Sequence, residues 1–172
     1  MKFNYENYIK SVMNFPIEGI NFRDITPLLA DSKAFKHACD DLTSMAKEVG
    51  AEVITGPESR GFFFSCPVAY NLGAGFVPIR KPGKLPRETE QVSYDLEYGK
   101  NTLCLHKDAI KPGQKVVIID DLLATGGTMK AAANLVEKLG GEVVGLFFVI
   151  ELEDLKGREF LKGYNVQSLI RY

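Results

Sequence analysis

The chain has 172 residues, of which 45% are hydrophobic and 25% charged, and its 21 basic and 22 acidic side chains leave a formal net charge of −1. This length and composition predict a single globular domain over residues 1–172 and argue against disorder. The balanced charge excludes a global field that would hold the protein on nucleic acid or on an anionic membrane. Any anion site must therefore be local.

The cysteines and the apolar runs indicate where the protein works. Cys39, Cys66 and Cys104 show neither paired nor metal-type spacing, which suits a reducing compartment. The first residues lack the apolar core of a signal peptide, and the longest apolar run, Val143 to Ile150, is far shorter than the roughly 20 residues that span a bilayer. We expect a cytoplasmic protein that does not enter a membrane.

The first third of the chain predicts two helices separated by a loop. Behind Asn4 as N-cap, apolar residues with helical spacing indicate a short helix from Tyr5 to Val12 that ends before Pro16. Residues 15–27 show neither the helical nor the strand period of apolar residues and are predicted to be an ordered loop. A longer helix is predicted from Ser32, as its cap, to residue 49, where Gly50 ends it.

The middle of the chain predicts a strand at 53–55, a helix at 62–72 and a strand at 76–80. Residues 81–90 are rich in Lys, Arg, Pro and Glu, which predicts an exposed, mobile loop. Alternation over 92–98, followed by the run 103–106, indicates a β-hairpin.

The last part predicts a βαβ unit: an apolar strand at 116–119, a helix at about 128–139 and a second apolar strand at 143–150. Continuous apolar strands that alternate with helices predict an α/β fold with a parallel sheet.

The strongest motif follows the strand at 116–119. Asp120 and Asp121 come at the carboxyl end of that strand, where open α/β proteins place their ligands. The loop after them ends at a predicted helix N-terminus, where glycines, hydroxyls and free amides suit a monophosphate; its residues are Ala124, Thr125, Gly126, Gly127 and Thr128. The two carboxylates can accept hydrogen bonds from vicinal hydroxyls. The loop and the carboxylates together therefore predict a ribose 5-phosphate site. The alternative is an ordinary strand-to-helix turn.

Residues 116–128 resemble the phosphoribosyl-pyrophosphate motif of the type I phosphoribosyltransferases. The resemblance covers nearly the whole chain and narrows to the branch that acts on adenine, through segments 15–27, 59–62, 79–86 and 96–99. It implies a type I phosphoribosyltransferase-like parallel sheet flanked by helices, an N-terminal hood at 1–31, and a flexible loop and β-hairpin lid at 81–106. It also implies a homodimer.

The activity implied is transfer of the 5-phosphoribosyl group from phosphoribosyl pyrophosphate to N9 of adenine, giving AMP and pyrophosphate in purine salvage. Mg²⁺ would bind mainly through phosphoribosyl pyrophosphate, with no dedicated protein ligands. The resemblance places the hood residues Asn21, Phe22 and Arg23 at the base, with Arg60 near it, and Glu97 as general acid or base on the lid, with Tyr98 covering the site. Asp120 and Asp121 would hold the ribose beside the developing positive charge. Pyrophosphate would meet Arg60, Arg80, Lys81 and Lys84.

Each of these assignments has a simpler alternative. Arg60 could be a surface arginine paired with Glu58, the basic loop could be merely solvated, Glu97 could be a strand-end glutamate, and Tyr98 could pack across the hairpin. His37 is expected to be solvated, and His106 to be structural. The family often carries acids near Asn101 and at the position of Cys104, so neither residue is claimed as a catalytic carboxylate.

Two rival functions remain. One is a phosphoribosyltransferase for hypoxanthine, guanine, xanthine or orotate, against which the segment Phe22 to Asp24 argues. The other is a regulator that senses phosphoribosyl pyrophosphate. The roughly 50 residues before the first sheet strand leave no space for a DNA-binding domain, and the sequence shows no basic face with aromatics for RNA.

Overall fold

The computed structural model describes residues 3–95 and 100–172. A five-stranded sheet in the order β4-β3-β7-β8-β9 forms its centre, and all four neighbouring pairs are parallel. The sheet strands are β3 (Val53–Pro57), β4 (Gly75–Ile79), β7 (Lys115–Leu123), β8 (Glu142–Glu151) and β9 (Val166–Arg171). The predicted α/β fold is confirmed.

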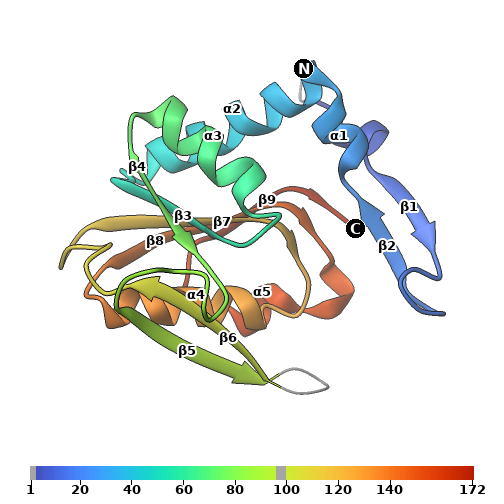
Figure 1. Ribbon diagram of the computed structural model, residues 1–172. Coiled ribbons are helices and arrows are strands. Elements are labelled where there is room, and N and C mark those ends of the chain that lie inside the picture. Colours follow the sequence, from blue (N-terminus) through green and yellow to red (C-terminus); the bar gives the residue numbers. More distant parts are fainter. Residues whose placement is uncertain (1–2, 96–99) are drawn as a thin grey trace.

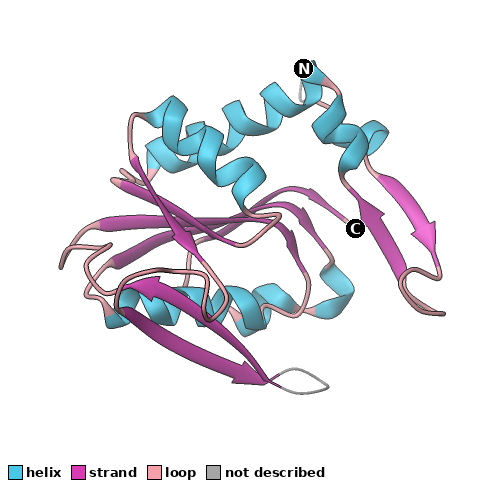
Figure 2. Cartoon of the chain, in the orientation of Figure 1, coloured by secondary structure: helices cyan, strands magenta, loops and turns pink. Residues whose placement is uncertain are grey.

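Helices cover both faces of the sheet (Figures 1 and 2). On one face lie α1 (Thr26–Ala30), α2 (Ser32–Glu48) and α3 (Phe62–Leu72); on the other lie α4 (Gly127–Lys138) and α5 (Gly157–Phe160). The central strand β7 serves both cores, because Val117 and Ile119 pack toward the first face while Val116 and Ile118 pack toward the second. Burial on both faces explains why β7 is a continuous apolar run rather than an alternating one.

Local sequence explains where the helices begin and end. The α2 helix buries small and apolar residues four apart, Ala34, Ala38, Leu42 and Ala46, against the sheet. Its cap is Asp31, whose carboxylate accepts hydrogen bonds from the amides of residues 33 and 34, so the prediction of Ser32 as the cap was wrong by one residue. The predicted α3 helix is confirmed at Phe62–Leu72.

The N-terminal region differs from its prediction. The capping role of Asn4 is confirmed, but the helix it caps is a single 3₁₀ turn, η1 (Tyr5–Tyr8). The chain then forms β1 (Lys10–Met13), which pairs antiparallel with β2 (Asn21–Asp24), and α1 follows, so the helix to Val12 and the loop over 15–27 were wrong. These strands of four residues pair with each other and are largely exposed, so they carry no alternating burial pattern.

The second hairpin agrees with the prediction over its described residues. Strands β5 (Thr89–Asp95) and β6 (Lys100–His106) pair antiparallel, from the Thr89–His106 pair to the Asp95–Lys100 pair. They lie beside α4, on the same side of the sheet (Figure 1). Residues 81–88 form an exposed loop before β5, which begins at Thr89 within the segment predicted to be loop.

Three elements near the C-terminus were not predicted: η2 (Glu153–Leu155), α5 and the edge strand β9. Within the described residues, no helix combines the length and the apolar character that crossing a membrane requires.

Candidate active site

The site lies where the sheet reverses its winding direction. Strand β3 leads into α3 on one face, whereas its neighbour β7 leads into α4 on the opposite face. The ladder between them ends at the pair Thr55–Ile118, although β7 continues to Leu123. A crevice at such a reversal is where open α/β sheets bind ligands.

Two carboxylates project from the far end of β7 into this crevice. Asp120 is half-buried and Asp121 is only 2% exposed. They belong to the strand itself, which runs four residues beyond its predicted end at Ile119. The amide of Asp121 donates a hydrogen bond to Oδ1 of Asp120 (2.9 Å), and Nε of Arg60 lies 3.2 Å from Oδ2 of Asp121. This Oδ2 is buried and accepts no hydrogen bond within the described part of the chain, so it has acceptor capacity to spare.

The electrostatics of this pair are unfavourable without positive charge nearby. Burial, and then the neighbouring carboxylate of Asp121, raises the pKa of Asp120 well above its ordinary value. Burial also raises the pKa of Asp121, although the guanidinium of Arg60 opposes that shift. A cation placed between these side chains and the solvent would therefore stabilise the ionised form of both carboxylates.

The loop after the carboxylates encloses a cavity of about 190 Å³. It is lined by Arg60, Asp120, Asp121 and every residue from Leu122 to Met129, with Phe148. Gly126 has φ +91°, a left-handed conformation that favours glycine, and the α4 helix begins at the next residue. The first amides of a helix have no partner within it, so this cavity presents free donors and the positive end of the helix dipole.

A second cavity of about 340 Å³ adjoins the first, because Arg60, Asp120, Asp121 and Thr128 line both. Its remaining walls come from the β3–α3 turn, from Lys81 and from the β5–β6 hairpin; the hairpin side chains are Tyr94, Asn101, Thr102 and Leu103. The two cavities thus bring together residues as far apart in the sequence as Pro57 and Phe148.

Glu58 in the β3–α3 turn does not pair with Arg60. Its carboxylate instead accepts a hydrogen bond from Nε of Arg80 and another from the amide of Lys81 (3.1 Å). Although burial alone would raise the pKa of Glu58, these donors lower it. The alternative of a surface Arg60–Glu58 pair was therefore wrong: Arg60 faces Asp121, and Glu58 holds the start of the basic loop.

A contact that the sequence did not reveal joins the β5–β6 hairpin to the glycine-rich loop. The hydroxyls of Tyr94 and Thr128 lie 2.9 Å apart, and Nδ2 of Asn101 donates to the Tyr94 hydroxyl across 3.5 Å. The Tyr94 ring also lies over Gly127, where an added Cβ would be 3.6 Å away. Alternation predicted a strand residue at position 94 but carried no signal for this partner, which is 34 positions away.

The three residues predicted for the hood differ in what they contact. The guanidinium of Arg60 lies 5.8 Å from the ring centroid of Phe22, which places Phe22 near the carboxylate site. Arg23 instead stacks on the ring of Tyr172 at 3.9 Å, with its buried Nε lacking a hydrogen-bond partner in the described structure. The Asn21 side chain accepts a hydrogen bond from Ser11 within the hairpin.

Two of the predicted basic residues, Arg80 and Lys84, line neither cavity. Lys84 is exposed on the loop and Arg80 lies behind Glu58. Glu97 and Tyr98 lie outside the described residues. Among the residues that the structure does describe, no group of three or more His, Cys, Asp or Glu side chains is arranged to hold a metal ion. His37, expected to be solvated, is exposed but stacks against Phe3 at 4.4 Å.

Comparisons with known proteins agree on one family. Residues 29–169 match the family described as "Phosphoribosyl transferase domain". The chain is 60% identical to the adenine phosphoribosyltransferase of Lactobacillus johnsonii, over all of this chain and 98% of that protein. The crystal structure of the enzyme of that name from Thermoanaerobacter pseudethanolicus superposes with a TM-score of 0.94 at 51% identity, covering 97% of each chain.

A further solved structure contains ligands. It is the adenine phosphoribosyltransferase of Saccharomyces cerevisiae in complex with adenine and D-2,5-dideoxy-2,5-imino-altritol 1,6-bisphosphate. Its TM-score to this chain is 0.90 at 41% identity, and the match covers 96% of each chain.

Proposed function

Because the chain belongs to the phosphoribosyltransferase family, we propose that it transfers the 5-phosphoribosyl group from phosphoribosyl pyrophosphate to N9 of adenine, giving AMP and pyrophosphate. The observation that carries the proposal is that the loop at the N-terminus of α4, which is suited to binding an anion, lies in the same crevice as the carboxylates of Asp120 and Asp121. The names of the full-length relatives support adenine as the acceptor.

In this proposal the loop from Ala124 to Thr128 binds the 5-phosphate. The free amides at the start of α4 and the hydroxyls of Thr125 and Thr128 would donate to its oxygens. Asp120 and Asp121 would accept hydrogen bonds from the ribose 2- and 3-hydroxyls, because a carboxylate accepts and a vicinal diol donates.

The carboxylate pair also supplies electrostatic stabilisation. Departure of pyrophosphate from C1 leaves positive charge on the sugar ring. Burial makes ionisation of both carboxylates costly, and repulsion by Asp121 adds to that cost for Asp120, so the pair is stabilised most when positive charge develops on the sugar. A gain that appears mainly in the transition state lowers the barrier rather than merely tightening substrate binding.

The pyrophosphate side of the reaction is assigned to basic residues at the second cavity. Arg60 and Lys81 line it directly, and Arg80 and Lys84 lie on the same loop as Lys81. An arginine fork binds a phosphate through two parallel hydrogen bonds, which suits Arg60 to the leaving group. The link from Glu58 to Arg80 and to the Lys81 amide fixes where this loop begins.

The residues present fit Mg²⁺, since Oδ2 of Asp121 is buried and accepts no hydrogen bond within the described part of the chain. Mg²⁺ usually takes one or two carboxylates and otherwise binds substrate phosphates and water. We assign it to phosphoribosyl pyrophosphate, with Asp120 and Asp121 as the nearest protein oxygens. When bound, it would neutralise charge on the departing pyrophosphate.

Adenine is placed under the hood formed by residues 1–31. Phe22 offers a ring face next to Arg60, and Asn21 and Arg23 shape the hairpin around it. Loss of the N9 proton is assigned to Glu97, with Tyr98 covering the site, on the lid over 81–106. A lid that excludes water protects a cationic sugar from hydrolysis. We also propose a single cytoplasmic domain, 1–172, that works as a homodimer in purine salvage.

The proposal is tested by initial rates with phosphoribosyl pyrophosphate and Mg²⁺ in five parallel reactions, with adenine, hypoxanthine, guanine, xanthine or orotate as acceptor. We expect AMP and pyrophosphate with adenine, and at most trace product with the others. Product with another base alone would refute the adenine assignment. Tight binding of phosphoribosyl pyrophosphate without turnover would instead favour a sensor.

A further inference from the structure

The α5 helix forms a backbone-to-backbone support behind the proposed phosphate loop. Gly157 lies so close to this loop that a Cβ added to it would be 2.2 Å from the carbonyl oxygen of Ala124. In return, a Cβ added to Gly126 would be 3.1 Å from the carbonyl oxygen of Gly157. No flexible side chain separates the two backbones at these points, so a shift of α5 moves the loop.

The α5 helix cannot hold its own position. It contains four residues, Gly157–Phe160, and helices this short are not stable in isolation because nucleation costs more than one turn recovers. Its place must therefore be fixed by contacts to the rest of the protein.

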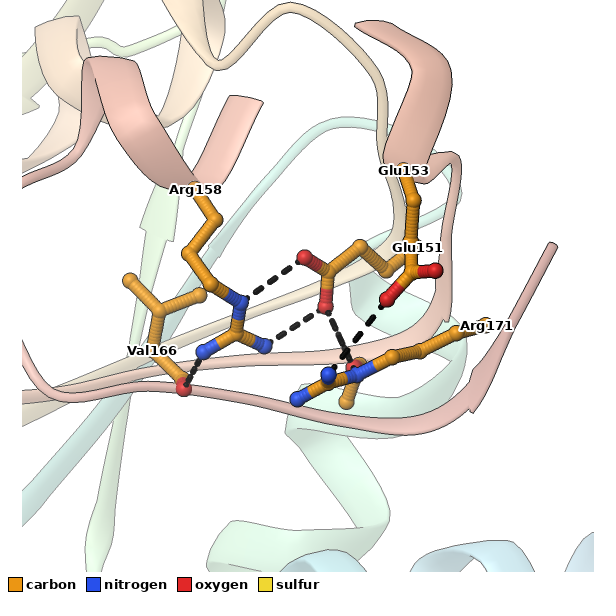
Figure 3. A network of polar contacts seen from close by, with 6 residues as sticks. Glu151, Glu153, Arg158, Val166 and Arg171 are labelled. Carbon is orange, nitrogen blue, oxygen red and sulfur yellow. Dashed lines mark hydrogen bonds and ion pairs between the residues drawn. The ribbon is translucent and has the colours of Figure 1, made fainter. Parts of the chain in front are cut away.

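Arg158, the second residue of α5, makes such contacts (Figure 3). Its guanidinium donates from Nε to Oε1 of Glu151 (2.8 Å) and from Nη2 to Oε2 (2.6 Å), a bidentate pair. Its third nitrogen, Nη1, donates to the carbonyl oxygen of Val166 at the start of β9. One side chain thus ties α5 to both β8 and β9.

Glu151 is a rigid anchor for this arginine. It is 3% exposed and ends β8, where it pairs with Leu123, the last residue of β7 before the loop. Ser168 donates a further hydrogen bond to it (2.6 Å), and Arg171 approaches it from β9 (3.4 Å). Hydrogen bonds from Arg158, followed by that from Ser168, outweigh burial and lower the pKa of Glu151, so it stays ionised at neutral pH.

We propose that Arg158 is a positioning residue for the phosphate loop: by clamping α5 to Glu151 it fixes the backbone amides that receive the 5-phosphate. This inference rests on the proposed function, in which residues 124–128 bind that phosphate. Arg158 itself touches no substrate. Its contribution should appear in the binding of phosphoribosyl pyrophosphate and not in that of adenine, whose proposed pocket lies under the hood.

The test compares Arg158→Lys with Arg171→Lys. Lysine keeps the charge but cannot reproduce the bidentate fork. Arg171 contacts the same carboxylate and also Glu153, yet it lies on β9 and not on α5, so its variant is a matched control. Rates of AMP formation give the two KM values and kcat, and thermal melting gives stability.

We expect Arg158→Lys to raise KM for phosphoribosyl pyrophosphate about tenfold, the scale of one lost charge-assisted hydrogen bond, with KM for adenine within about twofold of wild type. Arg171→Lys should leave both KM values within about twofold. The inference is overturned if Arg158→Lys lowers only the melting temperature, if it raises both KM values equally, or if Arg171→Lys has the same effect.

A second variant tests the same contact without touching the ion pair. In Gly157→Ala the new methyl group would overlap the Ala124 carbonyl, so the loop or α5 must shift. We expect KM for phosphoribosyl pyrophosphate to rise more than in Arg158→Lys, and ribose 5-phosphate to bind more weakly than to wild type in calorimetry. Unchanged binding in a folded variant would overturn the inference. Wild-type protein that makes no AMP would overturn the proposed function instead, which separates the two failures.

Discussion

Removing one hydroxyl, in Tyr94→Phe, should weaken the binding of phosphoribosyl pyrophosphate. Either hydroxyl can donate across the 2.9 Å between Tyr94 and Thr128. Because the Asn101 amide already donates to the Tyr94 oxygen, we infer that Tyr94 donates its own proton to Thr128. The Thr128 hydroxyl then keeps its own proton for a phosphate oxygen. Without Tyr94 as donor, the Thr128 hydroxyl loses this orientation, while the ring remains packed over Gly127.

The size of the effect follows from the contact that is lost. A neutral hydrogen bond in a partly buried site contributes about 0.5–1.5 kcal/mol, which corresponds to a rise in KM for phosphoribosyl pyrophosphate of about 2- to 13-fold. The melting temperature should fall by no more than about 2–6 °C for a chain of this size. KM for adenine should stay unchanged, because this contact lies at the phosphate loop.

Initial rates at varied phosphoribosyl pyrophosphate and saturating adenine measure the effect. Tyr70→Phe is the matched control, because it removes the same hydroxyl from a tyrosine that is 87% exposed on α3. If Tyr94→Phe lowers the melting temperature yet keeps the wild-type KM, the contact merely stabilises the hairpin, and the reasoning about Thr128 is refuted.

Three further variants test the electrostatics and the geometry of the crevice. Burial raises the pKa of Asp120, so its ionisation costs stability above the ordinary aspartate pKa of about 4; Asp120→Asn should melt higher than wild type at pH 7, converge with it near pH 3, and lose AMP formation. Removing the charge of Glu58 should change stability in the opposite direction, because Arg80 helps to lower the pKa of Glu58. Glu58→Gln should melt at a lower temperature than wild type at pH 7, and the two melting temperatures should converge as acid protonates the glutamate. Equal melting curves at pH 7 would contradict this. Gly126→Ala forces a side chain into φ +91° and to within 3.1 Å of the Gly157 carbonyl, so it should cost at least about 1–2 kcal/mol and raise KM for phosphoribosyl pyrophosphate, which calorimetry and rates would show.

The sequence predicted correctly those elements in which the spacing of apolar residues follows directly from which side chains are buried. The α2 helix carries buried residues four apart, and β7 is an uninterrupted apolar run because both its faces are covered. The adjacency of Asp120 and Asp121 to the glycine-rich loop was visible because strand, carboxylates and loop are consecutive in the chain. Periodicity and local motifs suffice for features of this kind.

The features that the sequence did not predict depend on distant partners. Strands β1 and β2 have four residues each, β1 exposed and β2 mostly half-buried, so neither carries the alternation that predicts a strand. Their pairing forms between residues on both sides of a turn. The contact between Tyr94 and Thr128 and the anchoring of Arg158 by Glu151 join separate elements. Glu58 pairs with Arg80, which was predicted to bind pyrophosphate, and not with Arg60; spacing alone cannot decide between these two arginines.

The measurement that tests the account most directly is a crystal structure of the complex with AMP. We expect the 5-phosphate within hydrogen-bond distance of the amides and hydroxyls of residues 125–128, and the ribose hydroxyls against Asp120 and Asp121. We also expect the adenine ring beside Phe22. A phosphate bound instead at Arg60 and Lys81, with residues 125–128 making no contact to it, would contradict the account.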